Sequence, residues 1–152
     1  MIIEDLKLNA SCRPIVADRI WQAFWKQSGA VLADVDAALY AVLAAERFPF
    51  TLIAKSDARF LGTVTAIESD IADRPQLGPC IAALWVEPEA RGKGIGRALV
   101  DVALGRLADA GKSQAYLPAR PHLLGYYSAR GWQLLERGVG ADDLDVFWRA
   151  LP

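Results

Sequence analysis

Residues 81–111 constrain the fold of this chain more than any other stretch, because they combine a buried strand, a glycine-rich turn and a helix. Residues 81–86 are almost wholly apolar and too few for a helix, which predicts a buried strand. Pro88 ends this strand, since proline has no N–H to give to a central ladder. Apolar residues then recur at helical spacing up to Gly111, a residue suited to the left-handed conformation that closes a helix.

Three glycines stand within five positions of the turn: Gly92, Gly94 and Gly96. The first N–H groups of a helix lack partners within the helix, and the helix dipole places partial positive charge there. Without Cβ atoms in the way, an anion such as a phosphate approaches these groups closely. Three cationic side chains surround the same turn: Arg91, Lys93 and Arg97. The turn is therefore predicted to bind an anion. The alternative is a tight strand–helix connection with solvated charges.

Two general phosphate-binding motifs do not fit this turn. The dinucleotide fingerprint requires glycine at its sixth position, where a motif starting at Gly92 has Arg97. The P-loop requires Ser or Thr after its Gly-Lys pair, where this chain has Gly94. The pattern Arg-x-x-Gly-x-Gly does fit, at Arg91, Gly94 and Gly96, after an apolar strand and a proline. This pattern resembles the acyl-CoA signature of the GNAT acetyltransferase superfamily.

The resemblance implies acetyl-CoA, or a longer acyl-CoA, as the co-substrate, and it implies no metal. In the family, the amides of the turn hold the CoA pyrophosphate, and the preceding strand offers backbone groups to the pantetheine arm. The residues that the resemblance assigns to the cofactor are Leu84, Trp85, Val86, Arg91, Gly92, Lys93, Gly94, Ile95, Gly96 and Arg97.

Residues 124–132 resemble a second GNAT signature, in which an aromatic residue and a tyrosine precede a glycine–aromatic pair. Tyr127 lies four residues before Gly131, at the position of the tyrosine that protonates the leaving thiol in the family. Tyr126 takes the neighbouring position, whose usual role is packing. Without the resemblance, a tyrosine on a short helix is more often a packing residue.

Two other features of the family do not stand at their usual positions. Many relatives have an asparagine seven residues before the tyrosine, where this chain has Arg120. Arg120 is suited to a CoA phosphate, to an acidic substrate or to an exposed position. Relatives that use a glutamate as base would place it around Cys80, where nothing acidic stands. Glu68, His122 and a chain of waters are the remaining candidates, so no base is assigned.

Periodicity and turn residues predict an α/β (α+β) fold in a single domain over residues 1–152. The predicted strands cover residues 2–8, 51–55, 60–68, 81–86, 114–117, 132–136 and 145–148. Four helices are predicted. The first begins near Pro14, the second ends before Pro49, the third follows the glycine turn and the fourth covers residues 122–130. This order is that of the GNAT fold, which implies a mixed, mostly antiparallel twisted sheet of about seven strands flanked by about four helices.

The first helix carries Trp21, Phe24 and Trp25 on one broad face, and these rings are predicted to lie in the core. In GNAT-like folds this helix and the next border the acceptor site, so the resemblance allows one ring to line it. Asp34 or Asp36 is predicted to cap the second helix.

The composition argues against several other classes of protein. A net charge of −1 gives no field that would attract nucleic acid or an anionic membrane, and no apolar run approaches a membrane span in length. Cys12 and Cys80 form no metal or redox spacing, which fits a reducing, cytoplasmic environment. Glu4 and Asp5 stand where a secretion signal would carry positive charge.

The resemblance thus implies an N-acetyltransferase that moves an acetyl group from acetyl-CoA directly to a primary amine, with Tyr127 as its catalytic residue. The alternative, from a different class, is a non-catalytic acyl-CoA-binding module that senses the cofactor or regulates a partner. Small molecules, peptide N-termini, lysine side chains and antibiotics are all compatible acceptors. A homodimer paired through the final strands is common in such folds.

Overall fold

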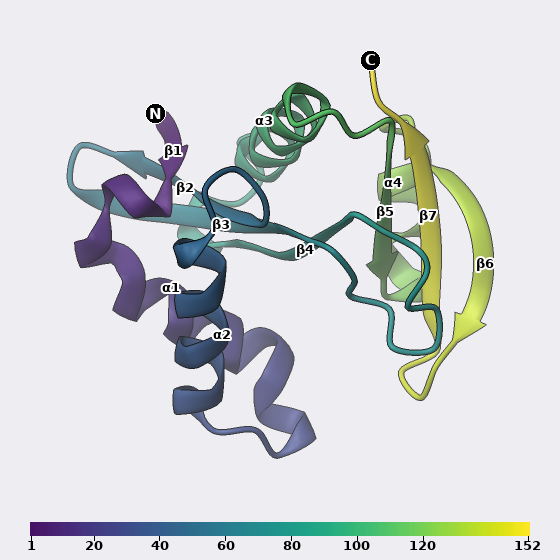
Figure 1. Cartoon of the computed structure of the whole chain (residues 1–152), viewed down its shortest axis with the longest axis horizontal. Coiled ribbons are helices and arrows are strands. Elements are labelled where there is room, and N and C mark those ends of the chain that lie inside the picture. Colours follow the sequence, from purple (N-terminus) through teal and green to yellow (C-terminus); the bar gives the residue numbers. More distant parts are fainter. The chain divides into compact units, whose positions relative to one another are not determined.

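The structure, a computed structural model, describes residues 1–152 as an α/β fold with one seven-stranded sheet (Figure 1). The strands are β1 (Ile2–Asp5), β2 (Phe50–Ser56), β3 (Arg59–Ile67), β4 (Cys80–Val86), β5 (Gln114–Ala119), β6 (Gln133–Val139) and β7 (Leu144–Ala150). The α-helices are α1 (Arg13–Ile20), α2 (Leu32–Ala44), α3 (Ile95–Asp109) and α4 (Leu124–Ser128). The strand order is β1-β2-β3-β4-β5-β7-β6. β4 and β5 are parallel, whereas β1–β2, β5–β7 and β6–β7 are antiparallel, so the predicted mixed sheet is confirmed.

The chain forms two compact units. Residues 1–65 and 83–103 make the first unit, and residues 66–82 and 104–152 make the second. Three elements, β3, β4 and α3, begin in one unit and end in the other. None of the helices combines the length and the apolar character that crossing a membrane requires.

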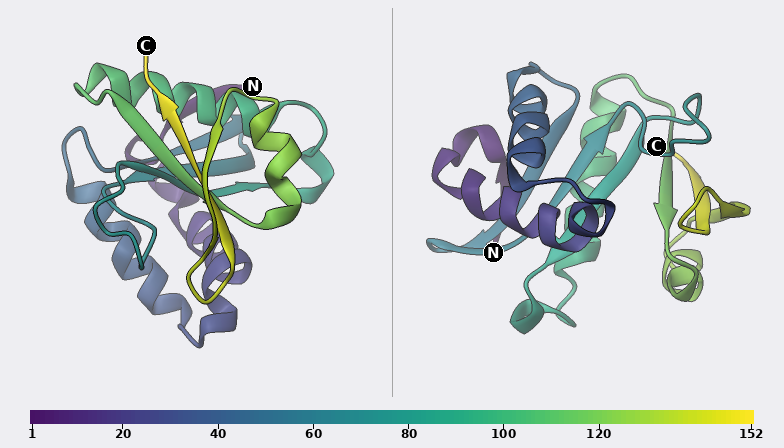
Figure 2. Two further views of the ribbon diagram at one scale, coloured as in Figure 1. Left: turned by 90° about the vertical axis from the view of Figure 1, so that its right-hand side faces the viewer. Right: turned by 90° about the horizontal axis from the view of Figure 1, so that it is seen from below.

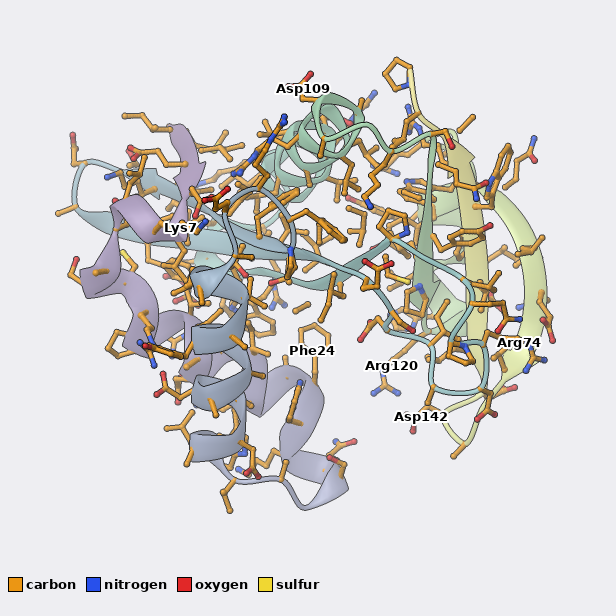
Figure 3. All side chains as sticks on the ribbon, viewed as in Figure 1. Lys7, Phe24, Arg74, Asp109, Arg120 and Asp142 are labelled. Carbon is orange, nitrogen blue, oxygen red and sulfur yellow. The ribbon has the colours of Figure 1, made fainter.

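In the first unit, α1 and α2 lie on one face of the strands and the N-terminal half of α3 lies on the other (Figures 1 and 2). The core under α1 and α2 consists of Leu6, Val16, Ala17, Ile20, Val35, Leu39, Ile53 and Phe60. Trp21 and Trp25 pack against this core, as predicted. Phe24 is 48% exposed and projects from its helix (Figure 3), so its predicted place in the core is wrong. The physical reason is that Trp21–Trp25 forms a π-helix, whose wider turn rotates residue 24 away from the face of the two tryptophans.

Two element ends depend on side chains that satisfy backbone N–H groups. The first strand ends at Asp5 rather than at residue 8, because the Asp5 carboxylate accepts the N–H of Lys7 at 2.9 Å and starts a 3₁₀ turn. Asp34 is the third residue of α2, and its carboxylate accepts the N–H of Val31 at 2.9 Å. It therefore gives a hydrogen-bond acceptor to the backbone of the residue that precedes the helix. Asp36 is not a cap, since its carboxylate pairs with Arg13 at 2.9 Å.

In the second unit, the two faces of β7 are covered by different segments. Val146 packs with Ile71 and Cys80, from the loop after β3 and the start of β4. Phe147 points to the opposite face, where its ring contacts Tyr127 of α4 at 5.5 Å between centroids. β5 continues through Pro118, which lies opposite Val146, so this strand ends later than the predicted residue 117. A proline fits within a strand where its nitrogen is not needed as a ladder donor.

Candidate functional site

The turn between β4 and α3 has a backbone that requires glycine. Gly92 has φ +77° and Gly94 has φ +81°, both in the left-handed region that other residues rarely adopt. A Cβ added to either residue would meet no atom within 4 Å. The turn therefore leaves open space beside its backbone, which is the condition for an anion to approach the amides.

The start of α3 supplies those amides. The carbonyl of Gly94 accepts the N–H of Ala98 at 3.0 Å, which makes Gly94 the residue that caps the helix. The N–H groups of Ile95, Gly96 and Arg97 consequently lie in the first turn, where a helix has no internal acceptor for them. Gly96 has a helical backbone within α3, so the φ requirement applies to Gly92 and Gly94 and not to Gly96.

Arg91 holds the turn against β4. Its Nε donates to the Val86 carbonyl at 2.8 Å, and its guanidinium lies 4.5 Å from the centroid of the Trp85 ring. A hydrogen bond from a charged donor contributes about 1.5–3 kcal/mol, and an exposed cation–π contact about 0.5–1 kcal/mol. Lys93 and Arg97 are exposed, which leaves their charges at the surface of the turn.

A buried carboxylate ties the same turn to α1. Glu87 is 6% exposed, and its carboxylate accepts Arg19 Nε at 3.0 and 3.1 Å and Trp85 Nε1 at 3.3 Å. Arg19 is 31% exposed, so the loss of this charged hydrogen-bond partner costs about 1.5–3 kcal/mol rather than the cost of a fully buried pair. The end of β4 is thus held by two arginines: Arg91 binds the Val86 carbonyl, and Arg19 of α1 binds the Glu87 carboxylate.

Two residues that shape β4 were not predicted from the sequence. Ala83 has φ +51°, a strained conformation for a residue with a Cβ, and it directly precedes Leu84. Gly62 on β3 lies so close to β4 that an added Cβ would be 2.7 Å from the Trp85 carbonyl and 3.2 Å from Leu99. A glycine within a strand can indicate such close approach, and this was the available signal at Gly62. No sequence pattern indicates a left-handed alanine.

Tyr127 lies in the second unit and is 7% exposed. Its ring makes edge contacts with Tyr126 and Trp132, at 5.0 and 6.5 Å between centroids. Burial raises the pKa of the Tyr127 hydroxyl to about 12, and the neighbouring Tyr126 also raises it, whereas Arg130 lowers it. The hydroxyl is therefore protonated at neutral pH, as a proton donor must be.

Asp70, which was not a candidate base from the sequence, is a carboxyl group with a raised pKa. Asp70 lies on the surface, yet the protein around it weakens its hydration and raises the pKa of its carboxyl to about 6. Its backbone N–H and its charge both act on Cys80, at the start of β4. Ten positions separate the two residues in sequence, so no motif could relate them. Glu68 and His122, the two residues considered from the sequence, are exposed.

The ten residues assigned to the cofactor lie together in the first unit, from β4 through the turn to the first turn of α3. Arg120 and Tyr127 belong to the second unit. Arg120 directly follows β5, is exposed and extends away from the ribbon (Figure 3). No group of three or more His, Cys, Asp or Glu side chains is arranged to hold a metal ion.

This strand, turn and helix are those of an acetyltransferase, and the sequence matches the acetyltransferase (GNAT) family over residues 17–132. The chain belongs to this family and is an acyltransferase by that membership. No curated protein sequence is similar enough to the chain to count as a match.

Solved structures share the fold over essentially the whole chain. An aminoglycoside 6′-N-acetyltransferase complexed with coenzyme A has a TM-score of 0.78 at 18% identity, covering 100% of this chain and 98% of its own. A GNAT-family acetyltransferase from Staphylococcus aureus Mu50 has a TM-score of 0.73 at 16% identity, covering 99% of both chains. The PaiA N-acetyltransferase from Thermoplasma acidophilum, in complex with coenzyme A, has a TM-score of 0.70 at 14% identity, again covering 99% of both chains.

Proposed function

We propose that this chain is a cytoplasmic N-acetyltransferase that moves an acetyl group from acetyl-CoA directly to a primary amine, within a single domain over residues 1–152. The continuity of β3, β4 and α3 through both compact units supports a single domain. The coenzyme A bound in two of the similar structures supports the co-substrate. Identities of 14–18% to those proteins leave the acceptor open.

The turn that begins α3 is the observation that carries this proposal. Two left-handed glycines leave open space beside the backbone, and the first amides of a 15-residue helix lie next to it. Such a turn suits a pyrophosphate, because the helix dipole adds to the unpaired N–H groups. Lys93 and Arg97 would add exposed positive charge, and the backbone of Leu84, Trp85 and Val86 would orient the pantetheine arm.

Tyr127 is proposed as the general acid. When the amine attacks the thioester carbonyl, a C–N bond forms and the C–S bond breaks, so that the sulfur leaves with a negative charge. Tyr127 would donate its hydroxyl proton to this sulfur and then recover a proton from water. A positioned acid of this kind contributes about 10²–10⁴ in rate.

Asp70 is proposed to accept the proton that the amine loses. An alkyl amine has a pKa of about 10.4, so only about one molecule in a few thousand is neutral at pH 7. Asp70 lies in the loop between β3 and β4, its backbone N–H acts on Cys80 at the start of β4, and its carboxyl is ionised above about pH 6. An ionised carboxylate with a raised pKa is a suitable base near neutral pH.

Acetyl-CoA should be incubated with the protein and a panel of amines: an aminoglycoside, a polyamine, a peptide with a free N-terminus and a lysine peptide. Mass spectrometry should show one acetyl group on one class of amine, with an equal amount of free CoA. Gly94→Val should abolish CoA binding in calorimetry, because valine resists the left-handed backbone and its side chain fills the open space. Gly105→Ala, in the middle of α3 with nothing within 4 Å of the added Cβ, is the control. Tight CoA binding without acetylation of any amine would favour the non-catalytic binding module.

A further inference from the structure

Arg130 has an unusual environment just beyond the end of α4. Its guanidinium carbon lies 3.6 Å from the centroid of the Tyr126 ring, and its Nη1 donates to the Tyr126 carbonyl at 2.8 Å. Its Nε is buried and has no hydrogen-bond partner. A buried donor without an acceptor destabilises a folded protein, so the stability of the fold does not explain this arrangement.

The orientation of Arg130 is fixed from β7 as well. Arg149 Nη1 donates to the Arg130 carbonyl at 2.7 Å. The Arg149 side chain also covers Gly131, where an added Cβ would lie 3.2 Å from Nη1. Gly131 itself has φ +89°, which turns the chain after α4. The backbone around Arg130 is therefore held by a strand, and its side chain is held by the helix that carries Tyr127.

The Tyr126 ring connects Arg130 to Tyr127. Arg130 lies on the face of this ring, and the ring meets Tyr127 edge-on at 5.0 Å between centroids and 87° between planes. The titratable groups that act on Tyr127 are Tyr126 and Arg130, and the other rings in contact with it, Trp132 and Phe147, carry no charge. Arg130 is thus the cation next to the tyrosine.

We propose that Arg130 is a positioning residue for Tyr127: it fixes the Tyr126 ring against Tyr127, and its positive charge stabilises the tyrosinate that forms when the hydroxyl proton moves to the leaving sulfur. This inference rests on the proposed role of Tyr127 as general acid. The proton balance is unchanged, because Tyr127 donates one proton to sulfur and recovers one from water. Arg130 remains protonated throughout, as guanidinium groups in proteins do.

A buried tyrosine is a weak acid. Burial raises the pKa of Tyr127 to about 12, so transfer of its proton to a thiolate is unfavourable without help. A nearby cation favours the charged form of the tyrosine and so lowers this cost. The charge of Arg130 acts on Tyr127 in this direction, and its buried Nε has no acceptor that would compete for it.

Arg130→Met and Arg130→Lys should be compared in the native protein and in a Tyr127→Phe background, with acetyl-CoA and the amine identified by the panel. In the native background, Arg130→Met should lower kcat about 3- to 30-fold and leave the KM for acetyl-CoA unchanged. Arg130→Lys keeps the charge without the planar stacking, so it should recover part of the loss. With Phe at position 127, Arg130→Met should change kcat less than about 2-fold, because the charge then has no tyrosinate to stabilise.

Arg74→Met is the matched control, since it removes the same charge from a side chain whose partners are Glu136 and the Asp73 carbonyl. It should leave kcat unchanged. Losses from Arg130→Met that persist at full size in the Tyr127→Phe background would overturn the inference, as would no rescue by lysine. Native kcat for Tyr127→Phe alone would instead refute the proposed role of Tyr127, so the two failures are distinguishable.

Discussion

Replacing Asp70 with asparagine should make the folded protein more stable at pH 8 and change its stability little at pH 4. The pKa of the Asp70 carboxyl is raised from 3.8 to about 6 by desolvation, so the folded state binds the proton more tightly than the unfolded state. Between these two pKa values the contribution of Asp70 to stability falls as pH rises, and above about pH 6 the folded protein bears the full cost of the poorly hydrated charge. Asparagine has no charge at any pH and removes this cost.

The size of the effect follows from the same shift. A difference of about two pKa units corresponds to about 3 kcal/mol at 1.36 kcal/mol per unit, which is an upper limit. Asp70 is exposed, so solvent screening reduces the expected gain to about 1 kcal/mol. For a chain of this length, such a gain raises Tm by about 2–4 °C.

Urea unfolding at pH 8 and pH 4 measures the difference directly. Asp142→Asn makes the same chemical change in the exposed loop between β6 and β7 (Figure 3), and should shift stability by less than about 0.5 kcal/mol at either pH. If Asp70→Asn is no more stable than the native chain at pH 8, the desolvation argument is refuted. If Asp70 also accepts the amine proton, the stabilised variant should lose about 10²–10⁴ in kcat/KM, a trade of activity for stability. Increased stability with full activity would exclude Asp70 as the base.

Three further predictions concern the other residues of the site. Tyr127→Phe keeps the aromatic packing and should lower kcat about 10²- to 10⁴-fold with little change in acetyl-CoA affinity; normal turnover would make Tyr127 a packing residue. Arg91→Ala should weaken CoA binding to a similar degree at low and high salt, because Arg91 contacts the Val86 carbonyl and the Trp85 ring of β4. Arg97→Ala should cause a smaller loss of affinity, and this loss should shrink at high salt because salt screens an exposed charge. Equal salt dependence of the two variants in calorimetry would contradict this division of roles. Gly62→Ala should destabilise the fold by about 1–3 kcal/mol in urea unfolding, whereas Gly105→Ala should stabilise α3 by about 0.5–1 kcal/mol. Equal changes in the free energy of unfolding for the two variants would rule out the close approach of β3 to β4.

The sequence was sufficient to predict the strand, turn and helix of the cofactor region, because glycine spacing and apolar periodicity are local properties of the chain. Gly92 and Gly94 have the left-handed backbone that only glycine adopts easily, so the turn could be predicted from the presence of glycine at these positions. The family membership and the seven-stranded sheet followed from the same local patterns.

Contacts between residues far apart in sequence could not be predicted. Arg91 was expected at an anion, and only the folded structure shows its guanidinium on β4. Asp70 acquires its raised pKa from its surroundings in the fold, and nothing in the loop sequence indicates them. Phe24 fits an apolar helical face in sequence, but the π-helix changes the period on which that inference depends.

The environment of Cys80 has a practical consequence for measuring the reaction. Burial raises the pKa of its thiol to about 11, so at pH 7.5 only about one Cys80 in three thousand is the thiolate that reacts with disulfide reagents. The side chain is also 0% exposed. A colorimetric assay of released CoA should therefore have a protein background of at most one thiol per chain, from the half-buried Cys12, and Cys12→Ser should remove it.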